Sequence, residues 1–454
     1  SECKSEKSKC SIKNKESFAE ILANLRIKGD RDVRNYSRGY SCMNGQWLGY
    51  LTNLQKDGKI LDIQQSFVVL NLGLNGQSFE GRVMLFSLNN RNWMAAQVKV
   101  NKKDFNQHTG IFTGKLSNFN PIKEDTTIGS WEEKEFSNIP KTEIPETGEF
   151  GGISGKSKTG ESVIIGRFKA GKTYEGKCYL KFYSSNKPYE YKDSDIKIYE
   201  KVESWEDFKK KIAEYNQDQK YIFRGQTGEK RENQWIQWKL RTSFHRTNRV
   251  DLFRYRDENI PELHRNINIS SNRSYDLNNP LDYEALLTLA QHHGYPTPIL
   301  DWTRCPYVAA YFAYENIAKN EAEQSKGYVR VFVFDTAKWV NGPDWIRRRT
   351  SKHKQAVKHL DCAFPSITYL EPSHEGNKRM LSQKAVCMFS SFDDIEGYVR
   401  YLENENKNVY LKIFDLPVRD RAKAMIDLHE MNITAAILFP DLDGIFKSLK
   451  EKLF

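Results

Sequence analysis

Short runs in which apolar and polar positions alternate fill the chain from about Tyr40 to Ser184. A period of two is typical of half-buried β-strands. Residue pairs that favour hairpin turns separate the runs: Asp57-Gly58, Asn75-Gly76, Asn89-Asn90, Thr159-Gly160 and Ala170-Gly171. The pattern therefore predicts a meandering antiparallel barrel or sandwich.

Within this β-rich segment an aromatic residue repeatedly stands two positions before a glycine. Positions two apart share a face of a strand, and the glycine permits a bend or a close approach of a neighbouring chain. We expect one such corner per hairpin, at Trp47-Gly49, Phe79-Gly81, Phe112-Gly114, Phe150-Gly152 and Tyr174-Gly176. Residues 118–147 contain Pro121, Pro140 and Pro145 and predict a long loop that interrupts the pattern.

The hydrophobic period becomes helical near Ser204, which is a suitable N-cap. The helix that follows has its apolar residues on one face: Trp205, Phe208, Ile212 and Tyr215. The strand Tyr221–Phe223 comes next.

Start and stop signals predict two more helices. Asn279 and Pro280 open the first, which Gly294 ends. Pro306 opens the second, which is apolar on most faces as far as Ile317 and is expected to be buried. Later strands are predicted at Tyr328–Phe334, Lys384–Phe389 and Val409–Phe414, and two helices finish the chain, one opened by Pro417 and one carrying Leu442, Ile445, Phe446 and Leu449. This mixed order of strands and helices is typical of an α+β fold.

These changes of pattern divide the chain into three parts. Residues 1–25 form a polar, basic tail that we expect to be disordered, and residues 26–198 form a β-rich accessory or binding domain. Residues 199–454 form the α+β domain. We expect that removing residues 1–198 leaves a soluble C-terminal domain.

Composition narrows the class of partner. The formal net charge is +11, which favours phosphate-bearing partners such as RNA or DNA. No apolar run is long enough to span a bilayer, so we expect no membrane association and a cytoplasmic location. The seven cysteines are scattered and fit reduced thiols better than disulfides, and no metal-ligand spacing is present.

Two segments of the α+β domain carry candidate chemistry. Arg224 ends an apolar strand, and Gly225 after it would let a ligand approach the main chain. The alternative role for Arg224 is a buried ion pair. The stretch Gln291–Ala313 (QHHGYPTPILDWTRCPYVAAYFA) brings together His292, His293, the triplet Asp301-Trp302-Thr303 and the start of a buried helix.

The residues of that stretch have structural alternatives as well. Asp301 or Thr303 can cap the helix, or the turn can direct main-chain N–H groups towards an anion. His293 falls on the apolar stripe and suits the core, whereas His292 points elsewhere.

These motifs resemble the FRG (Phe-Arg-Gly) domain over about residues 200–454. The naming tripeptide is Phe223-Arg224-Gly225, the second block is Gln291–Thr303, and Arg379–Val386 resembles a third block. The chain departs from the family pattern at Pro298, where arginine is usual, and at Cys305, where serine is usual.

The order of these blocks is also similar to that of ADP-ribosyltransferases. That resemblance implies a fold of that type and a reaction that cleaves NAD and transfers ADP-ribose to RNA, DNA or protein, in a toxin or phage-defence effector. It implies one cleft lined by Arg224, Thr303 and Gln383, with Glu371 or Asp301 as the carboxylate. Around the NAD it places Arg224, Gly225, Gln226, His292, Thr303, Tyr307, Tyr311 and Arg379, with the two tyrosines available to stack on nicotinamide.

Two other functions use the same residues. One is a non-catalytic module that binds a nucleotide or a nucleic acid, which the lack of an obvious catalytic carboxylate favours. The other is an NAD glycohydrolase. In each case the β-rich domain would bind a regulatory partner or support the fold.

Overall fold

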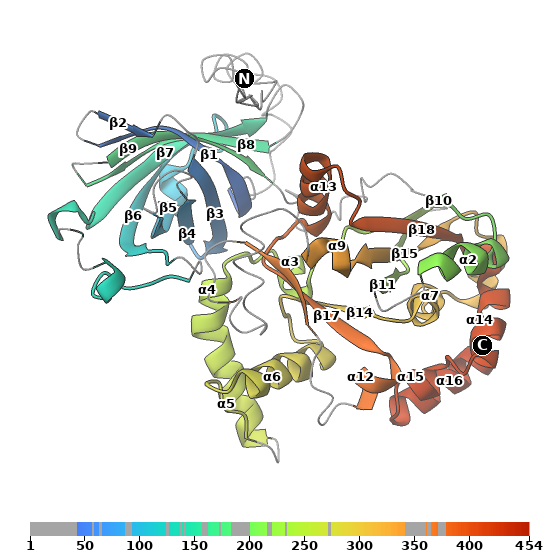
Figure 1. Cartoon of the computed structure of the whole chain (residues 1–454). Coiled ribbons are helices and arrows are strands. Elements are labelled where there is room, and N and C mark those ends of the chain that lie inside the picture. Colours follow the sequence, from blue (N-terminus) through green and yellow to red (C-terminus); the bar gives the residue numbers. More distant parts are fainter. Residues whose placement is uncertain are drawn as a thin grey trace, which may run out of the picture.

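The chain forms an N-terminal β-unit and a C-terminal α+β unit (Figure 1). The computed structural model describes residues 43–182 and 200–453 except for 57–58, 63–65, 87–92, 124–126, 137–138, 140, 157–161, 172–173, 216–219, 232–233, 271–273, 341–359, 361–364 and 371–377. The predicted tail, residues 1–25, lies outside the described residues.

The β-unit is a nine-stranded antiparallel sheet with the strand order β2-β1-β3-β4-β5-β6-β7-β8-β9. Strand β1 also pairs with β9, so the sheet curls into a nearly closed barrel. The predicted β-meander is therefore confirmed as a barrel. Its strands are β1 (Gly45–Lys56), β2 (Lys59–Asp62), β3 (Ser66–Asn75), β4 (Ser78–Phe86), β5 (Met94–Asn101), β6 (Ile111–Pro121), β7 (Thr147–Lys156), β8 (Ser162–Ala170) and β9 (Tyr174–Phe182).

Two of the predicted turn pairs are seen where they were expected. Gly76 joins β3 to β4 and Gly171 joins β8 to β9, both with positive φ. The pairs at Asp57, Asn89 and Thr159 lie outside the described residues. The predicted loop begins only after β6, because β6 keeps its pairing with β5 as far as Pro121.

Side chains fill the interior of the barrel. A Cβ on Gly81 would lie 1.8 Å from the main-chain oxygen of Asn71, so this glycine allows the close strand approach that the triplets predict. The aromatic residues of the triplets lie in the interior core, namely Trp47, Phe79, Phe112 and Phe150. A barrel filled in this way contacts other parts of the protein through its outer surface.

The α+β unit is built on a seven-stranded sheet with the order β10-β18-β15-β11-β14-β17-β16. The pair β10–β18 is parallel and the other pairs are antiparallel. The strands are β10 (Glu200–Lys201), β11 (Tyr221–Gln226), β14 (Ile299–Thr303), β15 (Tyr328–Asp335), β16 (Ile367–Leu370), β17 (Ala385–Ser390) and β18 (Leu411–Pro417), and β12 (Glu229–Arg231) and β13 (Gln234–Ile236) form a separate hairpin.

The predicted helix starts at Ser204, Asn279 and Pro306 are confirmed, whereas Pro417 ends β18 and a 3-10 turn (Val418–Asp420) precedes the α-helix that begins at Arg421. The side chain of Ser204 accepts from the N–H of Asp207 at the start of α2 (Trp205–Ile212), and that of Asn279 caps α6 (Pro280–His292). Pro306 opens the buried helix α7 (Pro306–Tyr314). The remaining α-helices are α3 (Ser243–Arg246), α4 (Leu252–Arg254), α5 (Ile260–Ser270), α8 (Lys319–Gln324), α9 (Thr336–Val340), α12 (Lys378–Ser382), α13 (Ile395–Asn406), α14 (Arg421–Glu430), α15 (Ala435–Leu438) and α16 (Leu442–Leu453).

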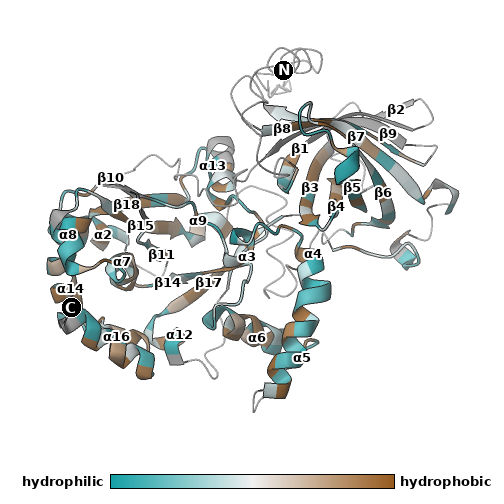
Figure 2. Cartoon of the chain, turned by 180° about the vertical axis from the view of Figure 1, so that it is seen from behind, coloured by the Kyte–Doolittle hydropathy of each residue, from teal (hydrophilic) through white to brown (hydrophobic). Residues whose placement is uncertain are grey.

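The predicted apolar stripe of α16 faces outward. Leu442 is 70% exposed and Phe446 66% exposed. Figure 2 shows brown segments on this helix at the C-terminal edge of the molecule.

The two faces of the large sheet have different coverings. On the face of Phe223, α7 packs over β11 and β15, and α6 packs over β14 and β17. On the face of Ile222, the sheet residues join a core cluster that continues into the barrel.

The barrel docks onto the α+β unit through a row of apolar residues on its outer surface. Leu48, Val69, Met84 and Ala95 pair across β1, β3, β4 and β5, and all are buried. They alternate with the residues that fill the interior, so they point outward. They belong to the same core cluster as residues of α4 and α13, and the guanidinium of Arg82 on β4 lies 4.4 Å from the Phe253 ring of α4.

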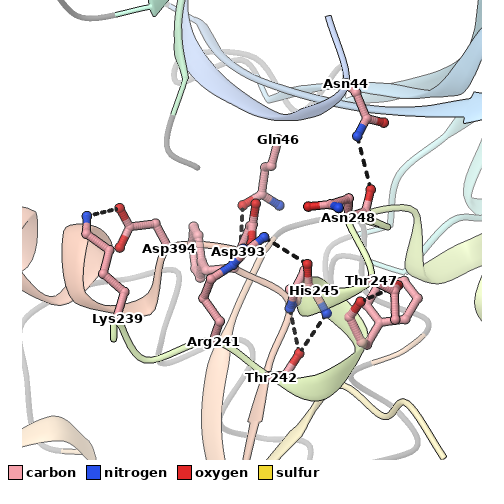
Figure 3. A network of polar contacts seen from close by, with 12 residues as sticks. Asn44, Gln46, Lys239, Arg241, Thr242, His245, Thr247, Asn248, Asp393 and Asp394 are labelled. Carbon is pink, nitrogen blue, oxygen red and sulfur yellow. Dashed lines mark hydrogen bonds and ion pairs between the residues drawn. The ribbon is translucent and has the colours of Figure 1, made fainter. Parts of the chain in front are cut away.

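Polar contacts fix the register of this docking (Figure 3). The side-chain Nε2 of Gln46 donates to the main-chain oxygen of Ser391 at 3.0 Å, and its Oε1 accepts from the N–H of Asp393 at 3.4 Å. Asp393 forms a buried ion pair with Arg241 at 2.6 Å. Arg241 donates in turn to the main-chain oxygen of His245 in α3 at 2.8 Å. The barrel therefore contacts the segment that supports α3.

Candidate functional site

The large sheet separates between β11 and β14. In the described part of the chain these strands pair at one position, Phe223 with Thr303, whereas β11 pairs with β15 throughout. Arg224 follows this last shared position. Its Nη1 donates to the main-chain oxygen of Asp301 at 2.5 Å and so bridges the strands where their main-chain pairing has stopped.

Arg224 combines a partly exposed side chain with a buried Nε. That Nε has no hydrogen-bond partner among the described residues. Burial lowers the pKa of the Arg224 guanidinium to about 10; Asp301 opposes this shift, and the charge of Arg246 adds to it. Arg224 is still a cation at neutral pH, and its unused donor at a strand junction suits an anionic ligand.

A chain of hydrogen bonds holds the carboxylate of Asp301. Gln291, in the last turn of α6, donates from Nε2 to Asp301 Oδ1 at 2.6 Å. Its Oε1 accepts from the hydroxyl of Thr297 at 2.7 Å. Asp301 is exposed whereas Thr297 is buried, so the amide of Gln291 fixes a carboxylate that a ligand can reach.

Thr303 and Gln383 are in contact, and their polar groups form hydrogen bonds that stabilise the fold. The hydroxyl of Thr303 donates to the main-chain oxygen of Gln383 at 2.7 Å and accepts from the N–H of Cys305 at 3.0 Å. The amide of Gln383 donates to the main-chain oxygen of Leu438 at 3.0 Å. Together they tie the turn before α7 to α12 and α15.

His292 and Arg379 lie at the edge of this region. Arg379 forms an ion pair with Asp441. Burial lowers the pKa of His292, and the positive charges of Arg379 and His293 lower it further, while Asp441 and Asp301 oppose the shift. His292 is therefore a neutral imidazole within electrostatic reach of Asp301. His293 follows the end of α6 and is exposed, so its predicted place in the core is wrong.

The expectation that Arg224 and Thr303 line one cleft together is also wrong. Phe223 pairs directly with Thr303, so these two side chains share a face of the sheet. Successive side chains point to opposite faces of a strand, which places Arg224 on the other face. Asp301 is the member of the triplet that meets Arg224, through its main-chain oxygen.

Gly225 and Gln226 have structural roles. A Cβ on Gly225 would lie 1.8 Å from the main-chain oxygen of Ala309, so this glycine allows α7 to pack against β11 and does not open the main chain to a ligand. The Nε2 of Gln226 donates to the main-chain oxygen of Trp238 at 2.6 Å.

Of the two tyrosines proposed to stack on nicotinamide, Tyr311 lies in the core and Tyr307 is partly buried against it. Tyr311 is fully buried, and its hydroxyl donates to Glu451 at 2.6 Å. Tyr307 packs edge-to-face against Trp205 at 6.3 Å between ring centroids. The stacking role of Tyr311 is therefore wrong, because its side chain is buried, and that of Tyr307 stays a prediction. The alternative carboxylate, Glu371, lies outside the described residues.

Sequence reasoning missed Gln291 and Thr297 as site residues. Both residues belong to the stretch Gln291–Ala313. The signal that could have identified Gln291 is its polar side chain at the end of a helix, ten residues before Asp301. Within the described ranges no cluster of three or more His, Cys, Asp or Glu side chains has the arrangement of a metal site.

Comparison with known proteins agrees with this location. Residues 219–322 match the family model of the FRG domain. The chain therefore carries an FRG domain, and the matched part contains Arg224, Arg246, Gln291 and Asp301. No curated protein and no solved structure match the chain. None of the helices described is both long and apolar enough to span a membrane.

Proposed function

We propose that the FRG-containing unit is an ADP-ribosyltransferase-like enzyme that cleaves NAD and transfers ADP-ribose to a macromolecule. The observation that carries the proposal is the contact between Arg224 and Asp301. It places a cation, whose buried Nε has no hydrogen-bond partner among the described residues, against the strand of Asp301, whose exposed carboxylate Gln291 holds in position on the other face of that strand.

The chemistry of NAD cleavage needs these two groups. The bond between nicotinamide and ribose breaks through a cationic, oxocarbenium-like state, which a fixed carboxylate stabilises. Asp301 would supply that charge and accept a hydrogen bond from a ribose hydroxyl. Arg224 would bind the pyrophosphate, whose oxygens match the planar guanidinium. His292 would contribute a neutral imidazole to the polar surroundings of Asp301.

The net charge of +11 favours a nucleic-acid acceptor, with RNA preferred. A toxin or phage-defence effector would use such an activity. These two statements rest on charge and on family resemblance, respectively.

A second candidate is a non-catalytic nucleotide-binding module. In ADP-ribosyltransferases a catalytic carboxylate is expected near the position of Gln383. Here the side-chain amide of Gln383 donates a hydrogen bond to the main-chain oxygen of Leu438 and stabilises the fold. Asp301 would then bind a ribose hydroxyl without bond cleavage.

Incubation of the full chain with NAD labelled in its adenosine half, together with RNA, DNA and protein, tests these functions. Label on an acceptor supports the transferase, and nicotinamide release without a labelled acceptor supports the hydrolase. Asp301→Asn is expected to reduce either reaction about 100-fold, because one well-placed charge contributes this much to a transition state. Exposed Glu430→Gln on α14 is the matched control and should retain full turnover. Binding of NAD without release of nicotinamide would contradict the enzymatic proposal and support the non-catalytic binding module.

A further inference from the structure

Helix α16 turns a polar side towards the rest of the protein. The hydroxyl of Tyr311 in α7 donates to Oε1 of Glu451 at 2.6 Å, and Lys447 forms an ion pair with Glu315, which follows α7. Gly444 is buried as well. Positions 444, 447 and 451 are three and four residues apart, so they lie on one side of the helix. These contacts fix the rotation of α16 about its own axis.

The apolar side chains of α16 lie on the opposite side of the helix and face solvent. They recur at the spacing of a single helical stripe, and all four are exposed: Leu442, Ile445, Phe446 and Leu449. A surface helix normally turns such a stripe towards the core. Here the stripe cannot reach the core unless the bonds of Glu451 and Lys447 break. An apolar stripe that is held outward in this way is typical of an interaction surface.

Two exposed residues of opposite charge lie along one edge of this stripe. Asp443 and Lys450 are seven positions apart, which is about two helical turns, so they share an edge of the helix. Phe446 lies near the midpoint between them. A second α16 that runs in the opposite direction therefore brings each Asp443 to the Lys450 of the other copy. The charges are complementary to the same helix reversed, and a two-fold pair makes each contact twice.

We propose that the exposed face of α16 is an interface between two copies of this chain, whose α16 helices pair in antiparallel order. The four apolar residues of each copy pack in the centre, and Asp443 and Lys450 form two ion pairs at the rim. One helix face is smaller than a standard interface of about 1,600 Å², so the dimer has a Kd in the micromolar range. The proposal goes beyond the proposed function and does not depend on NAD chemistry.

Sedimentation velocity of the full chain, from low to high micromolar concentration, tests this interface. The unsubstituted chain is expected to shift from monomer to dimer over this range. Phe446→Glu should weaken the association about 100-fold or more, because it places a charge at the centre of the apolar contact. Leu281→Glu on α6 replaces another exposed apolar residue and should leave the dimer intact. Phe446 is exposed, so its substitution preserves the fold, which the melting temperature checks.

Charge exchange tests the antiparallel order itself. Asp443→Lys alone, or Lys450→Asp alone, makes like charges face each other twice and should weaken the dimer about tenfold. An equimolar mixture of these two variants restores opposite charges in the mixed pair and should restore association. The chain that carries both substitutions should dimerise as well as the unsubstituted chain. A partner other than a second copy would not produce this pattern.

A chain that stays monomeric at every concentration would overturn the interface, as would a dimer that Phe446→Glu leaves unchanged. Single charge variants that associate normally, or a mixture that fails to restore association, would overturn the antiparallel pair. Binding of the monomer to phosphatidylserine vesicles that requires Phe446 would assign the face to a lipid surface instead of a second copy.

Discussion

At the scale of single residues, the site depends on which hydrogen-bonding groups the fold has already used. The hydroxyl of Thr303 and the amide of Gln383 bond to main-chain oxygens, so they position helices. Arg224 keeps a donor that has no partner in the part of the chain that the structure describes, and Asp301 remains exposed. This difference separates the functional candidates from residues of similar chemical type nearby.

Arg224→Lys tests the need for a planar cation. Lysine keeps the charge but cannot reach the main-chain oxygen of Asp301 and a phosphate with separate groups, so NAD turnover should fall about 100-fold, as in Arg224→Ala. The thermal midpoint should change little because Arg224 is partly exposed. Arg265→Lys is the control. Unfolding of both Arg224 variants would show instead that this arginine holds the core together.

His245 gives the fold a defined pH dependence. It is fully buried, and burial lowers its pKa to about 3, with the charge of Arg241 adding to the shift. The unfolded chain, with a pKa of about 6.5, takes up a proton that the folded chain excludes. Stability is therefore complete above about pH 6.5 and is lost as the pH falls towards 3, by about 2 kcal/mol at pH 5.

Urea unfolding at pH 8, 6 and 5 measures this effect. His245→Gln should flatten the dependence over this range, and exposed His429→Gln should keep it. Equal slopes for the unsubstituted chain and His245→Gln would show that other groups set the acid sensitivity.

At the scale of elements, three helices begin where the sequence predicts them because their signals are local. Ser204, Asn279 and Pro306 start helices through their own side chains or ring geometry. The role that a residue plays in packing between elements depends on residues far away in the sequence. The second residue after Phe223, Gly225, serves helix packing, which its place in a strand did not reveal.

Gly225→Ala should separate α7 from β11. The new Cβ would meet the main-chain oxygen of Ala309 at 1.8 Å, and neither backbone can move without disturbing the core. We expect a loss of about 2–3 kcal/mol in the free energy of unfolding by urea. The control is Gly73→Ala in β3, where the nearest atom would be 3.8 Å away. A stable Gly225→Ala chain that had lost only NAD turnover would restore the ligand-approach interpretation.

At the scale of the whole molecule, the barrel is an integral partner of the FRG-containing unit. A row on its outer surface is buried in a core cluster shared with α4 and α13, and Gln46 bonds to the segment that leads from β17 to α13. The expectation of an independent C-terminal domain was based on the change of hydrophobic period alone. The docking of the barrel argues against it.

Removal of residues 1–198 is therefore expected to give an aggregating fragment. The truncation would expose apolar side chains of the shared cluster, among them Phe253, Phe392 and Ile395. Size-exclusion chromatography and binding of a hydrophobic dye measure the outcome. Gln46→Ala in the full chain should remain soluble and lose about 1–3 kcal/mol, since it leaves buried main-chain groups unsatisfied. A monomeric fragment with sharp thermal unfolding would show that the two units are independent.

The sequence by itself determined many of the elements and the class of each of the two units. Alternation and turn pairs predict the barrel strands, caps predict the helices, and the Phe223-Arg224-Gly225 tripeptide predicts the FRG domain. These signals act within a few residues, where the main chain fixes the spacing of side chains. The contact of Arg224 with Asp301 was not determined in this way, although both residues were candidates.

Only the tertiary structure decided which side chains meet and which are already engaged. Arg224 and Asp301 are 77 positions apart and Gln46 and Ser391 are 345 apart. Their contacts depend on strand register, and a shift of one residue would move a side chain to the other face. Register follows from packing the whole core, in which the barrel takes part, so no local pattern could place Thr303 and Arg224 on opposite faces.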